Sequence, residues 1–154
     1  MAKVYGDHGD VATTLKWYKK ALAIYEKVLD KEHPIISNTY NNIGFAYNIH
    51  GDTATALEWY RKALAIREKV LGNEHPDTAT VYNNIACVYF HRKDYTTAME
   101  WYLMAYRIFL YKLGYTHPGA NTTKNNMEDA YHKAGLDEIE PFEQWLQKRL
   151  ASDQ

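Results

Sequence analysis

Paired asparagines recur along this sequence at a constant interval of 42 residues, as Asn41-Asn42, Asn83-Asn84 and Asn125-Asn126. A side-chain amide offers both hydrogen-bond donors and an acceptor, so it can pair with the N–H and C=O groups of an extended peptide whatever the side chains of that peptide. The pattern therefore favours a surface that binds peptide backbone. For Asn41, Asn83 and Asn125 we favour ligand contact, whereas for the second asparagine of each pair a hydrogen bond within the fold is an equal alternative.

Other residue types that could carry chemistry do not form a reactive constellation. His33, His75 and His117 each precede a proline at repeated positions, which favours structural roles over metal binding or catalysis. Cys87 has no base beside it in the sequence and is interpreted as a small packing residue. Neither a phosphate-binding glycine loop nor a His-Glu-x-x-His motif occurs. We therefore predict no enzyme activity, no catalytic residue, no metal and no cofactor.

Composition excludes several further classes of protein. The 154 residues include 18 basic and 19 acidic side chains, and this balance argues against a nucleic-acid partner held by a broad basic field. No apolar run approaches the roughly 20 residues that cross a bilayer, and the first residues lack the apolar core of a signal peptide. We expect a cytoplasmic protein without a membrane partner.

The asparagines belong to a repeat that covers nearly the whole chain. Residues 9–50 and 51–92 are identical at 24 of 42 positions without a gap. Each block contains one long and one short stretch with apolar residues at helical spacing, the short one running from Pro76 to His91 in the second block. Gly72 is a stop signal after the long stretch, and Asp52 is a plausible cap before it. The predicted fold is all-α, an α-solenoid of stacked antiparallel helical hairpins.

We interpret residues 1–154 as one domain. Its predicted parts are a partial helix over 1–8, a long helix over 11–29, repeats over 37–78 and 79–120, a helix over 119–133 and a capping helix over 140–151. The capping helix carries Phe142, Trp145, Leu146 and Leu150 on one face. The high aromatic content, 14%, is explained by repeated packing positions, among them Trp17, Trp59 and Trp101.

The spacing of large and small residues resembles that of tetratricopeptide repeats. The residues that carry the resemblance are Tyr40, Ile43, Gly44, Tyr47, Gly51, Ala56, Tyr60 and Ala63. The period of 42, with its Asn-Asn-Ile and His-Pro marks, is similar to the long repeats of kinesin light chains and nephrocystin-type proteins. The resemblance implies a superhelix whose short helices line a concave groove that binds a peptide or a helix of a partner protein.

On that resemblance, the groove is lined by one face of each short helix. The expected peptide-binding residues are Asn38, Asn41, Asn42, Phe45, Asn48, Thr80, Asn83, Asn84, Cys87, Phe90, Asn125 and Asp129, with Thr122, Asn126 and His132 at matching positions and Lys3 as the equivalent in the opening segment. Because this set is poor in basic residues, we expect a neutral or mixed peptide rather than an acidic one. The expected function is a non-catalytic protein-interaction module. The alternative is a self-associating module, a dimer or helix-swapped oligomer formed through exposed repeat ends.

Overall fold

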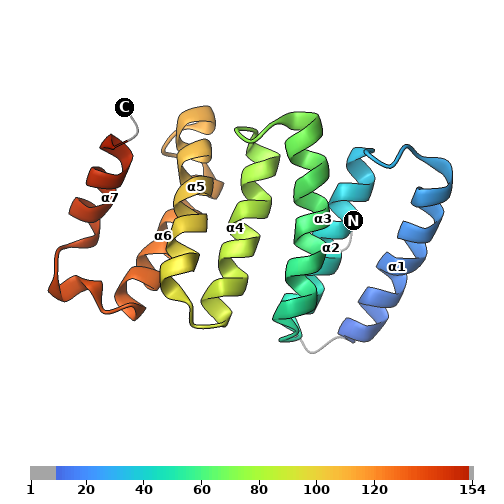
Figure 1. Ribbon diagram of the computed structural model, residues 1–154, viewed down its shortest axis with the longest axis horizontal. Coiled ribbons are helices and arrows are strands. Elements are labelled where there is room, and N and C mark those ends of the chain that lie inside the picture. Colours follow the sequence, from blue (N-terminus) through green and yellow to red (C-terminus); the bar gives the residue numbers. More distant parts are fainter. Residues whose placement is uncertain (1–9, 153–154) are drawn as a thin grey trace. The chain divides into compact units, whose positions relative to one another are not determined.

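The computed structural model describes residues 10–152, and in this range it is helical without strands (Figure 1). The helices are α1 (Val11–Val28), α2 (Pro34–Ile49), α3 (Thr53–Leu71), α4 (Pro76–His91), α5 (Tyr95–Leu113), α6 (Pro118–Lys133) and α7 (Phe142–Ala151), with a 3-10 turn, η1 (Leu136–Glu138), before α7. The predicted all-α fold is confirmed. The expected partial helix over 1–8 lies outside the described residues. No described helix is both long and apolar enough to cross a membrane.

The chain divides into two compact units at Ile66 and Arg67, inside α3. In the first unit α1 packs against α2, and in the second α4 packs against α5 and α5 against α6. Successive helices within each unit run in opposite directions, as the ribbon shows (Figure 1). The consecutive hairpins expected from the repeat are therefore present. The assignment of residues 1–154 to one domain, and the repeat bounds within it, stay predictions.

Aspartate and glycine stand at the start and end of the long helices α3 and α5. Gly72 and Gly114 follow α3 and α5 with φ of 90° and 87°, a left-handed conformation that glycine adopts without a steric penalty. The Asp52 carboxylate accepts a hydrogen bond from the Thr55 N–H at 3.1 Å, and Asp94 accepts one from the Thr97 N–H at 3.2 Å. These contacts confirm the expected stop at Gly72 and the expected cap at Asp52.

The three His-Pro pairs begin the short helices. Nδ1 of His33, His75 and His117 accepts a hydrogen bond from the backbone N–H two residues later, at 3.2, 3.0 and 3.0 Å respectively. Each imidazole thereby satisfies an N–H of the first helical turn that has no partner inside the helix. The proline that follows needs no such partner because it lacks an N–H. The structural role expected for these histidines is confirmed.

A small residue on α2 and another on α4 permit close approach of the long helix that follows each of them. In the first unit, a Cβ placed on Gly44 would lie 2.9 Å from Cδ1 of the Tyr60 ring and 3.2 Å from the Ala56 carbonyl oxygen. Tyr60 and Ala56 are both fully buried. In the second unit Ala86 takes the position of Gly44, and it is also fully buried, as is Ala98 on α5. The buried core therefore forms on one face of each short helix.

The repeated tryptophans do not all pack in the same way. The Trp59 ring lies 5.6 Å from that of Tyr40, and the Trp101 ring lies 5.7 Å from that of Tyr82. These two contacts confirm the predicted packing role. For Trp17 the prediction is wrong, since its side chain is 64% exposed. Trp59 and Trp101 each contact a tyrosine nineteen residues earlier in the sequence.

Helix α7 covers the end of the second unit, as the sequence predicts for a capping helix. Phe142 and Leu146 are each only 3% exposed, and the Tyr131 ring of α6 lies 5.4 Å from Phe142 and 5.3 Å from Trp145. The Tyr131 hydroxyl also donates a hydrogen bond to the Glu140 carbonyl at 2.7 Å. The cap is therefore joined to α6 by both aromatic packing and a polar contact.

Replacing Phe142 with alanine should lower the free energy of unfolding by about 3–5 kcal/mol, because the cavity would remove contacts with Tyr131 and Trp145. Chemical denaturation followed by circular dichroism measures this change. Gln144→Ala, at an exposed position of the same helix, is the matched control and should have little effect. Equal stability of the two variants would show that α7 does not cap the core.

Replacing His75 with alanine should cost about 1 kcal/mol of stability, because the Asp77 N–H would lose its acceptor at the start of α4. Asparagine is a good residue at this position, so His75→Asn should keep most of the stability. Thermal unfolding of both variants separates capping from bulk packing. Equal losses in the two variants would argue that the imidazole stabilises the turn by packing instead.

Candidate functional site

The groove residues expected on α2 lie on one face of that helix but differ in access to solvent. Asn38 and Asn42 are exposed, Phe45 is 44% exposed, and Asn41 is half-buried. Their spacing of three or four residues places them along a single stripe. Asn48 differs from the others because it is only 5% exposed. Asn48 lines neither of the two hollows described below, and its burial favours a role in packing.

On α4 and α6 the expected residues lie along two helices of the second unit. Thr80, Asn125 and Asp129 are exposed. The residues at half-buried positions are Asn83, Asn84, Cys87, Phe90 and Asn126. Thr80 also donates a hydrogen bond to the Pro76 carbonyl at 3.2 Å, which ties its hydroxyl to its own helix. The opening residue Lys3 lies outside the described range.

Asn83 takes part in a hydrogen bond between α4 and α6. Its side-chain oxygen accepts a hydrogen bond from the Thr123 hydroxyl at 3.0 Å, and Thr123 is only 1% exposed. Such a buried hydroxyl needs an acceptor, because leaving it without one costs about 1–3 kcal/mol. The amide oxygen of Asn83 is therefore engaged within the fold, at a position where the repeat pattern favours ligand contact. The sequence does contain a signal for this hydrogen bond, because the polar Thr123 occupies the repeat position at which the second block has the apolar Val81.

Residues of α4, α5 and α6 together line a hollow of about 160 Å³. We call it the α4–α6 hollow, and its lining residues are Cys87, Phe90 and His91 from α4, Tyr102 from α5, and Asn126 and Asp129 from α6. Cys87, Phe90 and Asp129 belong to the expected binding residues, and Asn126 stands at a matching position. Sequence reasoning missed Tyr102, because its repeat position marks it as a core residue.

The Tyr102 hydroxyl connects the core to this hollow. It donates a hydrogen bond to Sγ of Cys87 at 3.2 Å, and the Tyr102 side chain as a whole is 2% exposed. Burial raises the pKa of the Cys87 thiol, although the hydrogen bond from Tyr102 acts in the opposite direction. Burial likewise raises the pKa of Tyr102. Both groups therefore stay protonated at neutral pH, and a neutral thiol is a poor nucleophile.

A lysine that the sequence reasoning did not single out lies beside the hollow. Nζ of Lys133 lies 4.9 Å from the centre of the Phe90 ring, on its face, and 3.8 Å from Oδ2 of Asp129. Asp129 and Lys133 are one helical turn apart, a spacing at which opposite charges meet on a helix surface. This spacing is the sequence signal for the ion pair. The contact with Phe90 depends on how α4 and α6 pack and could not be read from the sequence.

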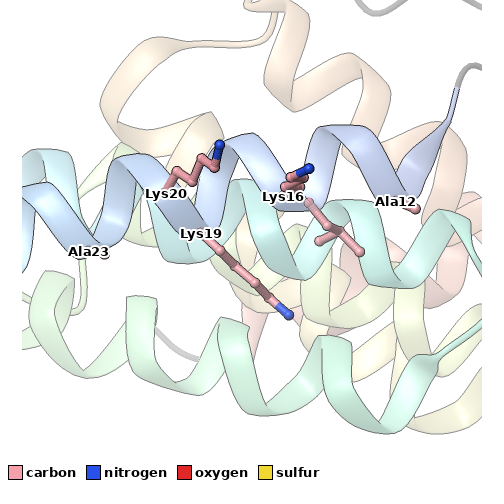
Figure 2. Close-up of a pocket in the computed structure, with 6 residues that line it drawn as sticks. Ala12, Lys16, Lys19, Lys20 and Ala23 are labelled. Atoms are coloured by element: carbon pink, nitrogen blue, oxygen red, sulfur yellow. The ribbon is translucent and has the colours of Figure 1, made fainter.

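A second hollow, of about 590 Å³, runs along one side of α1 (Figure 2). Its lining residues are Ala12, Leu15, Lys16, Lys19, Lys20 and Ala23. Figure 2 shows the side chains of Lys19 and Lys20 leaving α1 in different directions. Nζ of Lys19 donates a hydrogen bond to the Tyr47 hydroxyl at 2.8 Å, and Nζ of Lys20 lies 5.0 Å from the centre of the Trp17 ring. Both lysines therefore interact with aromatic side chains of the first unit.

Across residues 10–152, no three side chains of histidine, cysteine, aspartate or glutamate gather in an arrangement that could hold a metal ion. The hollow between α4 and α6 instead offers an amide, a carboxylate and an aromatic face. Such groups can bind a ligand by hydrogen bonds and by charge.

Comparison with known proteins agrees with this architecture. The chain is similar to BtubC (BKLC) from P. vanneervenii, with 23% identity over 82% of this chain and a TM-score of 0.74. It is also similar to a protein from Podosopora anserina that is described as a kinesin light chain and has TPR-like repeats nearly identical to one another. The identity is 24% over 94% of this chain, and the TM-score is 0.66. A form of those repeats with one residue replaced gives 24% identity over 94% of this chain and a TM-score of 0.68.

These structures are longer than the chain described here, which spans 51% of BtubC and 67% and 66% of the two Podosopora anserina chains. At such identities the likeness concerns the fold. No curated protein sequence matches the chain. A family model for the tetratricopeptide repeat matches residues 1–69 and 36–110. With helical hairpins, the 42-residue period and a family match over more than half of its residues, the chain belongs to the tetratricopeptide-repeat family.

Proposed function

We propose that this chain is a protein-interaction module that holds a segment of a partner protein on the face formed by its short helices. Tetratricopeptide repeats generally serve as non-catalytic scaffolds for protein contacts. The observation that carries the proposal is the convergence of Cys87, Phe90, Asn126 and Asp129 on one hollow. These residues come from two successive short helices, at positions that the repeat pattern assigns to a binding face.

The size and chemistry of the hollow favour a peptide over a small molecule. Pockets for drug-sized ligands usually enclose about 300–1,000 Å³, whereas this hollow measures about 160 Å³. It therefore suits one side chain of a longer segment. Around it, the amides of Asn125 and Asn126 can donate and accept hydrogen bonds with peptide backbone. The Phe90 ring adds an apolar contact.

Replacing Asn125 and Asn126 with alanine should weaken binding of a peptide selected from a random library about tenfold, because two hydrogen bonds of about 0.5–1.5 kcal/mol each would be lost. Fluorescence anisotropy with the labelled peptide measures this change. The double variant Gln144→Ala/Gln147→Ala removes two amides from exposed positions on α7 and is the matched control. Unchanged affinity in the asparagine variant, with thermal unfolding like that of the unmodified chain, would contradict the proposal.

A second candidate function is self-association through α1. Trp17, Ile24 and Val28 are 64%, 60% and 70% exposed, and their spacing of seven and four residues places them on one side of the helix. The repeat counterparts of the first two, Trp59 and Ile66, pack against the buried cluster of the first unit. Large exposed apolar side chains on one face are typical of an interface. A second copy of this chain could cover them.

If this candidate is correct, light scattering should show a rising molar mass with concentration, and Trp17→Ser/Ile24→Ser should stay monomeric because it removes the apolar surface. Tyr111→Ser/Tyr115→Ser is the control, since both tyrosines are exposed, by 63% and 75%, and lie outside α1. An unmodified chain that remains monomeric at all concentrations would exclude self-association through this face.

A further inference from the structure

We propose that the α4–α6 hollow accepts a positively charged side chain, that of an arginine, from the segment held on the short helices. This inference rests on the proposed function and names the kind of partner residue that the hollow recognises. It is carried by the acceptor groups that line the hollow and by a cation of the chain itself that already lies beside them.

Three of the six residues that line the hollow offer oxygen acceptors, and His91 adds an imidazole. Asp129 brings a carboxylate, the one acidic side chain among the six lining residues, and Asn126 brings an amide oxygen. The Tyr102 hydroxyl already donates its proton to Cys87, so toward another partner its oxygen can only accept. A guanidinium group carries five N–H donors in a planar fork and has no acceptor, which makes it complementary to such a lining.

The ammonium group of Lys133 already lies beside the hollow. Its Nζ lies 4.9 Å from the centre of the Phe90 ring and 3.8 Å from Oδ2 of Asp129. An aromatic face attracts a cation within about 6 Å of its centre. The distance of 3.8 Å to Asp129 exceeds that of a hydrogen bond, and the two side chains remain 47% and 55% exposed. The pair is therefore loose, and an incoming guanidinium that bonds Asp129 in a bidentate way can replace Lys133.

The Asp129 carboxylate also disfavours a neutral side chain in the hollow. A neutral side chain placed over Asp129 would take the carboxylate out of water without compensating its charge, which is unfavourable. A cationic side chain compensates it. The volume agrees with a single side-chain end, because about 160 Å³ is well below the roughly 300–1,000 Å³ of pockets that enclose drug-sized ligands.

The test is an NMR titration of the ¹⁵N-labelled chain with N-acetyl-arginine N-methylamide and with its citrulline counterpart, which has nearly the same shape but no charge. We expect the arginine compound to shift the amide signals of Cys87, Phe90, Asn126 and Asp129, and to bind about fivefold more tightly than the citrulline compound. Asp129→Asn should abolish this preference. Lys133→Gln should increase arginine affinity about twofold, because it removes the internal competitor.

Glu138→Gln is the matched control, since it removes an exposed acidic charge from η1, outside the hollow, and should leave both titrations unchanged. Equal affinity for the two compounds, or a preference that survives Asp129→Asn, would overturn the inference. So would weaker arginine binding by Lys133→Gln. This inference can fail while the proposed function stands. Library peptides that bind through Asn125 and Asn126 without any preference for arginine would overturn the inference alone.

Discussion

The structure depends on the close approach of α2 to Tyr60 of α3 in the first unit and of α4 to α5 in the second unit. Gly44 leaves no room for a side chain beside the Tyr60 ring, and Ala86 holds the same position in the second unit. Because one face of the short helix is fixed against large buried residues, the opposite face must point outward. Of the repeated asparagines, Asn42 and Asn125 are exposed there, whereas the others of the three pairs are half-buried. The packing of the helices therefore determines which side chains are accessible to a ligand.

The same constraint links the core to the candidate site. A tyrosine is large enough to fill the space beside a small residue, but its hydroxyl needs a hydrogen-bond partner when buried. Tyr82 meets this need through the Glu68 carboxylate at 2.8 Å, whereas Tyr102 meets it through Cys87 at the edge of the hollow. Packing against α4 thus brings a polar atom of a core residue to the surface that we propose as a binding face.

Sequence reasoning predicted the helices well, because their periodicity, caps and stop signals are local. Helix α4 begins at Pro76 and ends at His91, as the pattern predicts, and the histidines cap the helices through contacts only two residues away. The candidate site was less predictable, because it depends on how two helices pack. The bond from Thr123 to Asn83 and the position of Lys133 over Phe90 both join residues more than 39 positions apart. No local pattern sets such contacts.

In the proposed function, the outward face of α4 and α6 binds a segment of a partner protein. The most direct test of this proposal is an amide chemical-shift map of the unmodified chain with a peptide selected from a random library. We expect the largest shifts at the residues around the α4–α6 hollow, which include Cys87, Phe90, Asn126 and Asp129. Shifts confined to α1 or α7 would contradict it, because they would place the binding surface away from the face that the packing turns outward.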